Sequence, residues 1–188
     1  MDVVERVLSF WYDVEFLDLA ADGDHRMVWF KKDDAFDKAI RNQFQADVTA
    51  AANGEYDVLC ETVEGVLTLS ILLDQFPRNL HRGSPRAFAT DALALDIVKS
   101  AVASGFDAEL GKTRRMFLYF PFEHSENLED QDMSVWLFRA LKDEQSYNYA
   151  IEHYYVISRF GRFPGRNAAL GRNSTPEELE FLKLFGAY

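Results

Sequence analysis

Arginine, histidine and carboxylate side chains gather in three short stretches of this sequence, each containing a Phe-Pro pair. The stretches are DQFPRNLHRG (74–83), FPFEHSE (120–126) and FGRFPGRNAALGRNSTPEE (160–178). Arginine presents a planar fork of N–H donors that matches carboxylates and phosphates. A histidine flanked by carboxylates, as in Glu-His-Ser-Glu, suits a general base or a hydrogen-bond anchor. The pattern predicts a pocket for a small anionic ligand, with residues able to move a proton.

Each Phe-Pro pair is expected to end a helix, because the residue before proline is pushed out of the helical region. Proline also fixes φ, so the polar residues that follow leave the helix at a set angle. If the three ends lie on one side of the domain, these residues line one cleft. The predicted catalytic residues are His124, Glu123 and Glu126. The predicted ligand-binding residues are Asp74, Arg78, Asn79, Arg82, His153, Arg162, Arg166, Asn167 and Arg172.

A purely structural interpretation of the same residues stays open. Arginine near a helix C-terminus can bond to the last carbonyls and favours the helix dipole. Ion pairs such as Asp74 with Arg166, or Glu126 with Arg162, would then stabilise contacts between helix ends. Structural ion networks and functional sites look alike at this level. The density of arginines, with glycines at 161, 165 and 171 that let the backbone approach a ligand, favours a site.

No motif in the sequence indicates a metal or an organic cofactor. His124, Glu126 and His153 lack the spacing of a recognised metal site. There is neither a P-loop nor a GxGxxG fingerprint, and Ser125 beside His124 is not a nucleophile elbow. His153 lies on a helical pattern and is expected to be partly buried. We therefore expect no metal and no cofactor.

Length and composition indicate one domain with a sizeable core, residues 1–188, or at most two small domains that share that core, and hydrophobic periodicity makes it all-helical. The chain is 48% hydrophobic and carries 16 Phe, which excludes disorder. Its net charge of −11 argues against nucleic acid or an anionic membrane as a partner. A small acidic metabolite or a peptide is the expected partner. The lone Cys60 is expected to be a buried structural thiol, and with no signal peptide or membrane span in the pattern a cytoplasmic protein is expected.

Hydrophobic periodicity predicts helices and no strand. About eight antiparallel helices are expected, spanning about 2–12, 34–52, 56–75, 85–103, 113–120, 130–142, 146–159 and 176–185. Apolar positions at Phe36, Ile40, Phe44 and Val48 form one stripe on the second helix. The helix at 56–75 is apolar nearly all round and is expected at the centre. Thr175-Pro176-Glu177-Glu178 is typical of a capping box.

Three segments resemble signature segments of domain-of-unknown-function family 924. They are LLDQFPRNLHRG with AFATDALAL, FLYFPFEHSE, and FGRFPGRNAALGRNSTPEELEFL, and the likeness runs from about Phe10 to the end. This mainly bacterial family is grouped with the tetratricopeptide-like helical superfamily. The resemblance implies a right-handed superhelical array of antiparallel helices and no established activity. The family often has His or a similar residue where this chain has Gly165, and an aromatic residue where it has His81, so the side chains at 165 and 81 are not expected to carry essential chemistry.

The helical array adds a second functional hypothesis. Such folds often present a concave face that binds peptides. The chain is short for that use and lacks plain repeats, and most of its aromatic residues fall on core faces. The two hypotheses, a ligand pocket and a protein-interaction module, are distinguished by whether the three Phe-Pro stretches converge.

Overall fold

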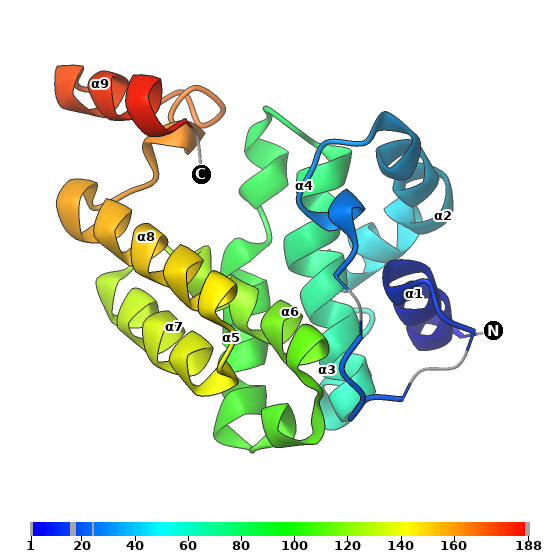
Figure 1. Cartoon of the computed structure of the whole chain (residues 1–188). Helices are drawn as coiled ribbons and strands as arrows, with labels where there is room; N and C mark the ends of the chain where they lie inside the picture. Colours follow the sequence, from blue (N-terminus) through cyan, green and yellow to red (C-terminus); the bar gives the residue numbers. More distant parts are fainter. Residues whose placement is uncertain (1, 16–17, 24, 187–188) are drawn as a thin grey trace.

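The computed structural model describes residues 2–15, 18–23 and 25–186 (Figure 1). Within these residues the chain forms eight continuous helices and no strand, as the periodicity predicts. The α-helical elements are α1 (Val3–Tyr12), α2 (Asp34–Ala52), α3 (Val63–Ser70), α4 (Phe76–Leu80), α5 (Asp91–Ala103), α6 (Lys112–Glu123), α7 (Leu128–Leu141), α8 (Glu144–Phe160) and α9 (Pro176–Phe185). A π-helical turn (Ile71–Gln75) joins α3 to α4, so these two make one continuous helix. Short 3-10 turns cover Met27–Trp29, Asp57–Glu61, Pro85–Phe88, Phe106–Glu109 and Pro164–Arg166.

The continuous helix from Val63 to Leu80 lies at the centre of the molecule (Figure 1). It contacts α1, α2, α5 and α6, although only two of these adjoin it in the sequence. Its residues Leu67, Ile71 and Phe76 are fully buried. Aromatic rings from other helices surround it, with Trp11 packed edge-on against both Phe76 and Phe117. The apolar character of this helix on all sides is therefore explained by its many neighbours.

Helices α6, α7 and α8 pack against one another in chain order (Figure 1). Their connections are only a few residues long, so consecutive helices run antiparallel. Lys142, in the left-handed conformation, closes the tight turn between α7 and α8. A smaller cluster of Val156, Ile157, Phe163 and Phe181 then ties α9 to the end of α8.

Local residue types explain several helix ends. The Asp33 side chain accepts hydrogen bonds from the backbone N–H groups of Ala35 and Phe36 and so caps α2. Gly54, just beyond α2, has φ of 79°, a left-handed conformation that glycine adopts without strain. Thr175 and Glu178 form the predicted capping box of α9, each side chain accepting from the other residue's backbone N–H.

The prediction that Phe-Pro pairs end helices is wrong: two pairs lie inside helices, and α8 ends at Phe160, before the third pair, which begins a 3-10 turn. Pro77 lies inside the central helix, and Pro121 lies inside α6. Each proline lacks the N–H that would bond the carbonyl four residues earlier. A hydroxyl from another element bonds that carbonyl instead: Thr90 Oγ1 donates to the Leu73 carbonyl (2.5 Å), and Ser70 Oγ donates to the Phe117 carbonyl (2.7 Å). The helices therefore continue for about one more turn past each pair.

Two further expectations need correction. The central helix begins at Val63, since Asp57–Glu61 forms a separate 3-10 turn. Cys60 lies on that turn and is exposed, not buried. The predicted helix over 85–103 is likewise divided, because the Ser84 cap and Pro85 begin a 3-10 turn and α5 starts only at Asp91. This division matters for the site, because it places Asp91 in a first helical turn.

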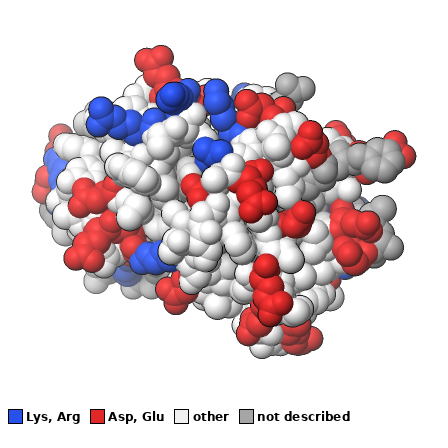
Figure 2. Space-filling model, turned by 90° about the horizontal axis from the view of Figure 1, so that it is seen from below, with Lys and Arg blue, Asp and Glu red and all other residues white. Residues whose placement is uncertain are grey.

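Acidic residues are scattered over the face shown in Figure 2, separated by uncharged residues, whereas Lys and Arg gather mainly along its upper margin. Across residues 2–15, 18–23 and 25–186, no helix has both the length and the apolar character that a membrane span requires.

Candidate functional site

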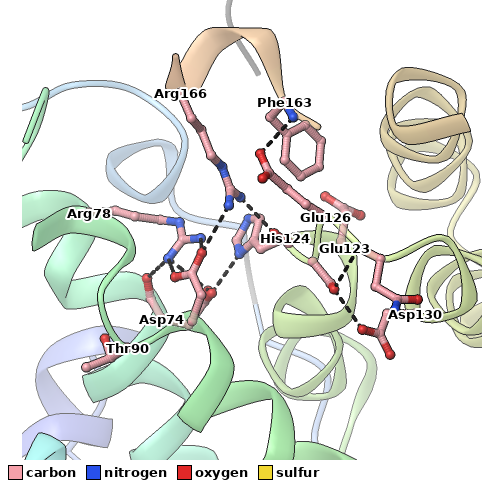
Figure 3. A network of polar contacts seen from close by, with 12 residues as sticks. Asp74, Arg78, Thr90, Glu123, His124, Glu126, Asp130, Phe163 and Arg166 are labelled. Carbon is pink, nitrogen blue, oxygen red and sulfur yellow. Dashed lines mark hydrogen bonds and ion pairs between the residues drawn. The ribbon is translucent and has the colours of Figure 1, made fainter. Parts of the chain in front are cut away.

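Asp74 is a fully buried carboxylate on the π turn of the central helix (Figure 3). Its Oδ1 lies 2.7 Å from His124 Nδ1 and 3.1 Å from Arg78 Nη1. Its Oδ2 accepts a hydrogen bond from Gln75 Nε2 at 2.6 Å. The π turn widens the helix just before Pro77, and such turns are frequent at functional sites. Two partners from the same helix and one from the residue that directly follows α6 therefore meet at one buried charge.

Arg78 and Arg166 converge on a second carboxylate, that of Asp91 at the start of α5. Arg78 forms a two-pronged contact, Nη1 to Oδ1 at 2.9 Å and Nη2 to Oδ2 at 3.0 Å. Arg166 reaches the same group with one contact, Nη1 to Oδ2 at 3.2 Å. Its Nη2 donates to the His124 backbone carbonyl at 2.8 Å. The first, second and third Phe-Pro stretches are thereby joined (Figure 3).

Arg166 is held between two aromatic rings. Its guanidinium lies 4.8 Å from the ring centroid of Phe88 and 4.5 Å from that of Phe163. Burial, together with the nearby charge of Arg78, lowers the pKa of Arg166 to about 10. The group remains charged at neutral pH. A cation fixed in poorly hydrated surroundings attracts an anion more strongly than one in water.

The Asp74–His124 pair is ionised on the carboxylate and neutral on the ring. Burial raises the pKa of Asp74, but Arg78 and His124 outweigh it and hold that pKa at about 2. Burial, then Arg78, lowers the pKa of His124 to about 4, despite the opposing effect of Asp74. An ionised carboxylate can only accept, so the neutral ring donates from Nδ1. Its Nε2 is then an unprotonated acceptor, for which no partner is found among the described residues.

Glu123 adds a group with the opposite shift. It is buried at the end of α6, and burial, then Asp74 and Glu152, raises its pKa to about 8. It is therefore largely protonated at neutral pH. Its Oε2 makes no hydrogen bond within the part of the chain that the structure describes. A neutral carboxyl beside a neutral imidazole gives the region both a proton donor and a proton acceptor.

His153 lies next to both of these groups. Its Nδ1 is 2.8 Å from the Tyr149 carbonyl and 3.6 Å from Glu123 Oε1. Its ring centroid lies 6.5 Å from that of His124. Burial lowers the pKa of His153 to about 4, so it is neutral. We call the seven residues Asp74, Arg78, Asp91, Glu123, His124, His153 and Arg166 the polar centre.

Glu126 and Arg172 lie outside the polar centre and join the last loop to the connection between α6 and α7. Arg172 donates to Glu126 with both Nη atoms, at 2.7 and 3.0 Å, and its Nε donates to Asn167 Oδ1 at 2.9 Å. Glu126 Oε1 also accepts from the backbone N–H of Phe163 at 2.8 Å. The pairing of Glu126 with Arg162 suggested by the sequence is therefore wrong, and Arg172 takes that place.

Arg162 instead binds Glu178 of α9, with Nε and Nη2 contacts of 2.7 and 2.9 Å. The amide of Asn167 lies 3.3 Å from the same Glu178 and donates to Ser174 Oγ at 3.0 Å. Because Glu178 is also the capping-box residue, this group fixes α9 on the loop before it. Arg166, for its part, pairs with Asp91 and not with Asp74 as suggested.

Asn79 and Arg82 form a third group, facing α2. Asn79 donates to Asp37 Oδ1 at 2.8 Å, and Arg82 binds both oxygens of Asp37 at 2.6 and 2.8 Å. Asn79 and Arg82 line an open hollow of about 320 Å³ together with Lys32, Asp34, Asp37, Lys38, Arg41 and Leu80. Another hollow, of about 420 Å³, is lined by Glu144, Gln145, Asn148, Tyr149 and Glu152. Neither hollow is lined by a residue of the polar centre.

The sequence reasoning missed Asp91, although Asp91 joins the two central arginines. The available signal was Thr90-Asp91, a pair that often begins a helix. It was overlooked because Ser84-Pro85 marks an earlier start of the same kind. Among the described residues, no group of three or more His, Cys, Asp or Glu side chains is arranged to hold a metal ion.

A family model described as "Bacterial protein of unknown function (DUF924)" matches residues 7–186. The chain is also similar to the solved structure of a protein of unknown function, ATU0120, from Agrobacterium tumefaciens. The two share 36% sequence identity and a TM-score of 0.88, and the match covers 97% of each chain. No curated protein matches the chain.

Proposed function

The chain belongs to the DUF924 family of bacterial proteins, and we propose that it binds a small anionic molecule at its polar centre and exchanges a proton with it. The observation that carries this proposal is the buried Asp74–His124 pair, with Nδ1 2.7 Å from the carboxylate and two arginines beside it. A carboxylate that orients an imidazole leaves the far nitrogen available as a base. The arginines supply the charge that an anion requires.

Individual roles follow from the protonation states. His124 Nε2 accepts a proton from the ligand, and Asp74 stabilises the imidazolium that results. Glu123, protonated at neutral pH because its pKa is about 8, serves as the complementary donor. Arg166 orients the anion. A base and an acid with pKa values moved in opposite directions are the usual sign of such a division of roles.

The competing structural interpretation explains the outer groups better than the polar centre. Arg82, Arg162 and Arg172 each bind a carboxylate with two contacts, which satisfies both partners. The polar centre keeps Glu123 Oε2 buried without a hydrogen bond and places two arginines on one carboxylate. Groups left in this state cost stability and are retained most often where a protein has a use for them.

The first test is a thermal-shift screen of small organic acids. A ligand present at 100 times its dissociation constant stabilises the protein by about 2.7 kcal/mol. Arg166→Gln should remove the shift, whereas Arg159→Gln, which alters an exposed ion pair with Glu177, should keep it. Equal shifts in both variants would count against the polar centre as the binding site.

The second test follows the proton itself. A ligand found in the screen is incubated with the protein in deuterium oxide, and incorporation of deuterium at a carbon of the ligand is measured by NMR, because protons on oxygen and nitrogen exchange with solvent unaided. His124→Asn should still show a thermal shift but should slow the incorporation by a factor of about 100 or more, the range expected for loss of a general base. Undiminished incorporation in His124→Asn would contradict the proton-transfer role.

A protein-interaction module of the tetratricopeptide-like type is the second candidate. The observation in its favour is a set of exposed aromatic residues on α7 and α8, namely Trp136, Tyr149 and Tyr155. Exposed aromatics are the usual anchors of binding surfaces. A right-handed superhelical array would present them to a peptide. Trp136→Ala should then abolish binding of a selected peptide, with Val58→Ala, another exposed apolar residue, as the control.

A further inference from the structure

The Asp91 carboxylate occupies the position in the polar centre where two guanidinium groups converge. Arg78 grips it with two nearly equal contacts, 2.9 and 3.0 Å, the geometry in which a guanidinium fork matches the two oxygens of a carboxylate. Arg166 adds the third contact at 3.2 Å. Asp91 and both arginines retain some solvent access, with side-chain exposures of 17%, 20% and 10%. The two guanidinium groups therefore enclose a carboxylate that the chain itself supplies.

We propose that Asp91 stands in for the anionic group of the ligand, and that the ligand is a small carboxylic acid. On binding, the ligand carboxylate takes the place of the Asp91 carboxylate between the two arginines, beginning at Arg166, which holds Asp91 by a single contact. We call the position between Arg78 and Arg166 the seat of the ligand's anionic group. The inference rests on the proposed function, because the seat lies within the same polar centre. His124, whose backbone carbonyl is bonded to Arg166, then lies next to the bound molecule.

Charge balance distinguishes a carboxylate from a phosphate. The polar centre holds two cations, Arg78 and Arg166, and two anions, Asp74 and Asp91, while its other members are neutral. When Asp91 turns toward solvent, one cation is left for one negative charge. A phosphate dianion would bring a second charge into a poorly hydrated region, which is costly without a further partner. The seat therefore suits one carboxylate.

Chemical rescue tests this seat without knowing the ligand. In Asp91→Ala the seat is empty, so the protein should melt at a lower temperature than the wild type. Sodium acetate should restore stability in a saturable manner, raising the melting temperature by roughly 3–6 °C at ten times its dissociation constant. Sodium chloride and sodium phosphate at the same ionic strength should restore much less. The wild type, with Asp91 in place, should respond weakly to acetate.

Two further variants make the result decisive. Asp91→Ala/Arg166→Gln should lose the acetate response, whereas Asp91→Ala/His124→Asn should keep it, because the seat does not need the proton acceptor. Absence of a saturable acetate response, or an equal response to chloride, would overturn the seat. If Asp91→Ala does not fold, Asp91→Asn replaces it, and acetate must stabilise that variant more than the wild type. If acetate stabilises Asp91→Ala but the wild type incorporates no deuterium into its ligand, the anion-binding position is supported and only the proton-transfer role is disproved.

Discussion

Arg78 and Arg166 bind the same carboxylate from two stretches of chain that share almost the same wording, FPRN and FPGRN. The first stretch lies within the central helix and the second forms a 3-10 turn. Their backbones therefore differ, yet both arginines reach Asp91. The two similar stretches of sequence therefore have different backbone conformations but supply arginines to the same carboxylate.

The asparagines of the two stretches behave alike as well. Asn79 donates to Asp37, and the Asn167 amide lies 3.3 Å from a carboxylate oxygen of Glu178. Each of these carboxylates also receives two contacts from an arginine, Arg82 in the first case and Arg162 in the second. In each stretch the arginine faces the polar centre while the asparagine anchors the chain to a neighbouring helix.

Replacement of Arg166 tests whether the convergence on Asp91 stabilises the fold. Arg166→Gln should lower the free energy of unfolding by about 1.5–3 kcal/mol, the range for hydrogen bonds to charged groups. The loss is limited because Asp91 keeps both contacts with Arg78. Urea denaturation followed by circular dichroism measures the change.

Arg159→Gln is the matched control for that measurement. Arg159 is exposed and pairs with Glu177, and exposed ion pairs contribute little. Its unfolding midpoint should stay close to that of the wild type. A larger loss in Arg159→Gln than in Arg166→Gln would contradict the importance of the buried contact.

Glu123 should make the protein less stable as pH rises above neutrality. Its pKa is about 8 in the folded protein against an ordinary 4.5. Between these values the folded state holds a proton that the unfolded chain releases, so this stabilisation is present at low pH and is lost as pH rises through 8. His124, with a pKa lowered from 6.5 to about 4, acts oppositely and adds stability as pH rises from 4 to 6.5. Above pH 6.5 only the loss from Glu123 remains.

Glu123→Gln isolates that effect. The wild type should lose at most about 1.4 kcal/mol per pH unit between pH 6.5 and 8, the slope for one proton. Glu123→Gln should be flat over the same interval, while Glu144→Gln, an exposed change on α8, should retain the slope. Urea midpoints at half-unit pH steps give the comparison. A wild-type profile that rises from pH 6.5 to 8 would disprove the protonated state of Glu123.

The protonation of His124 can be observed directly. Long-range proton–nitrogen NMR spectra should show a neutral ring with its proton on Nδ1 at pH 7, because the ionised Asp74 accepts there. On acidification the ring should titrate near pH 4. Asp74→Asn should move this pKa lower still, since Asp74 favours the charged ring. A ring that is charged at pH 7, or one protonated only on Nε2, would contradict the geometry.

Regular helices were predictable where apolar residues repeat at helical spacing and a local cap marks the start. In α2 the Asp33 cap and the stripe that includes Ile40 and Phe44 act within one segment, so the sequence nearby suffices. The π turn was not predictable. Proline favours a helix end, and the bond that lets the helix pass Pro77 comes from Thr90, on another element. Propensity is overridden there by a tertiary contact.

The candidate site was likewise predictable only where local sequence determines it. His124, Arg78 and Arg166 could be selected because their residue types suit anions and protons and stand beside conspicuous Phe-Pro pairs. Their convergence required a fold, and the sequence marked Asp91, the partner of the two arginines, only as the possible start of a helix. Protonation states were also out of reach, since the pKa of Glu123 depends on burial that only packing creates.

The central helix should depend on the Thr90 hydroxyl to continue beyond Pro77. Thr90→Val keeps the shape of the side chain but leaves the Leu73 carbonyl without its 2.5 Å donor. An unsatisfied buried carbonyl costs about 1–3 kcal/mol. In Pro77→Ala the backbone N–H returns and can serve that carbonyl, so Thr90→Val should cost less in that background. The four proteins form a double-mutant cycle, measured by urea denaturation, in which a coupling energy of about 1 kcal/mol is expected.

Ser70→Ala with Pro121→Ala offers an independent cycle at the second proline, where the Ser70 hydroxyl donates to the Phe117 carbonyl. Strict additivity in both cycles would show that the hydroxyls do not compensate for the prolines, and the continuity of these helices would then need another cause.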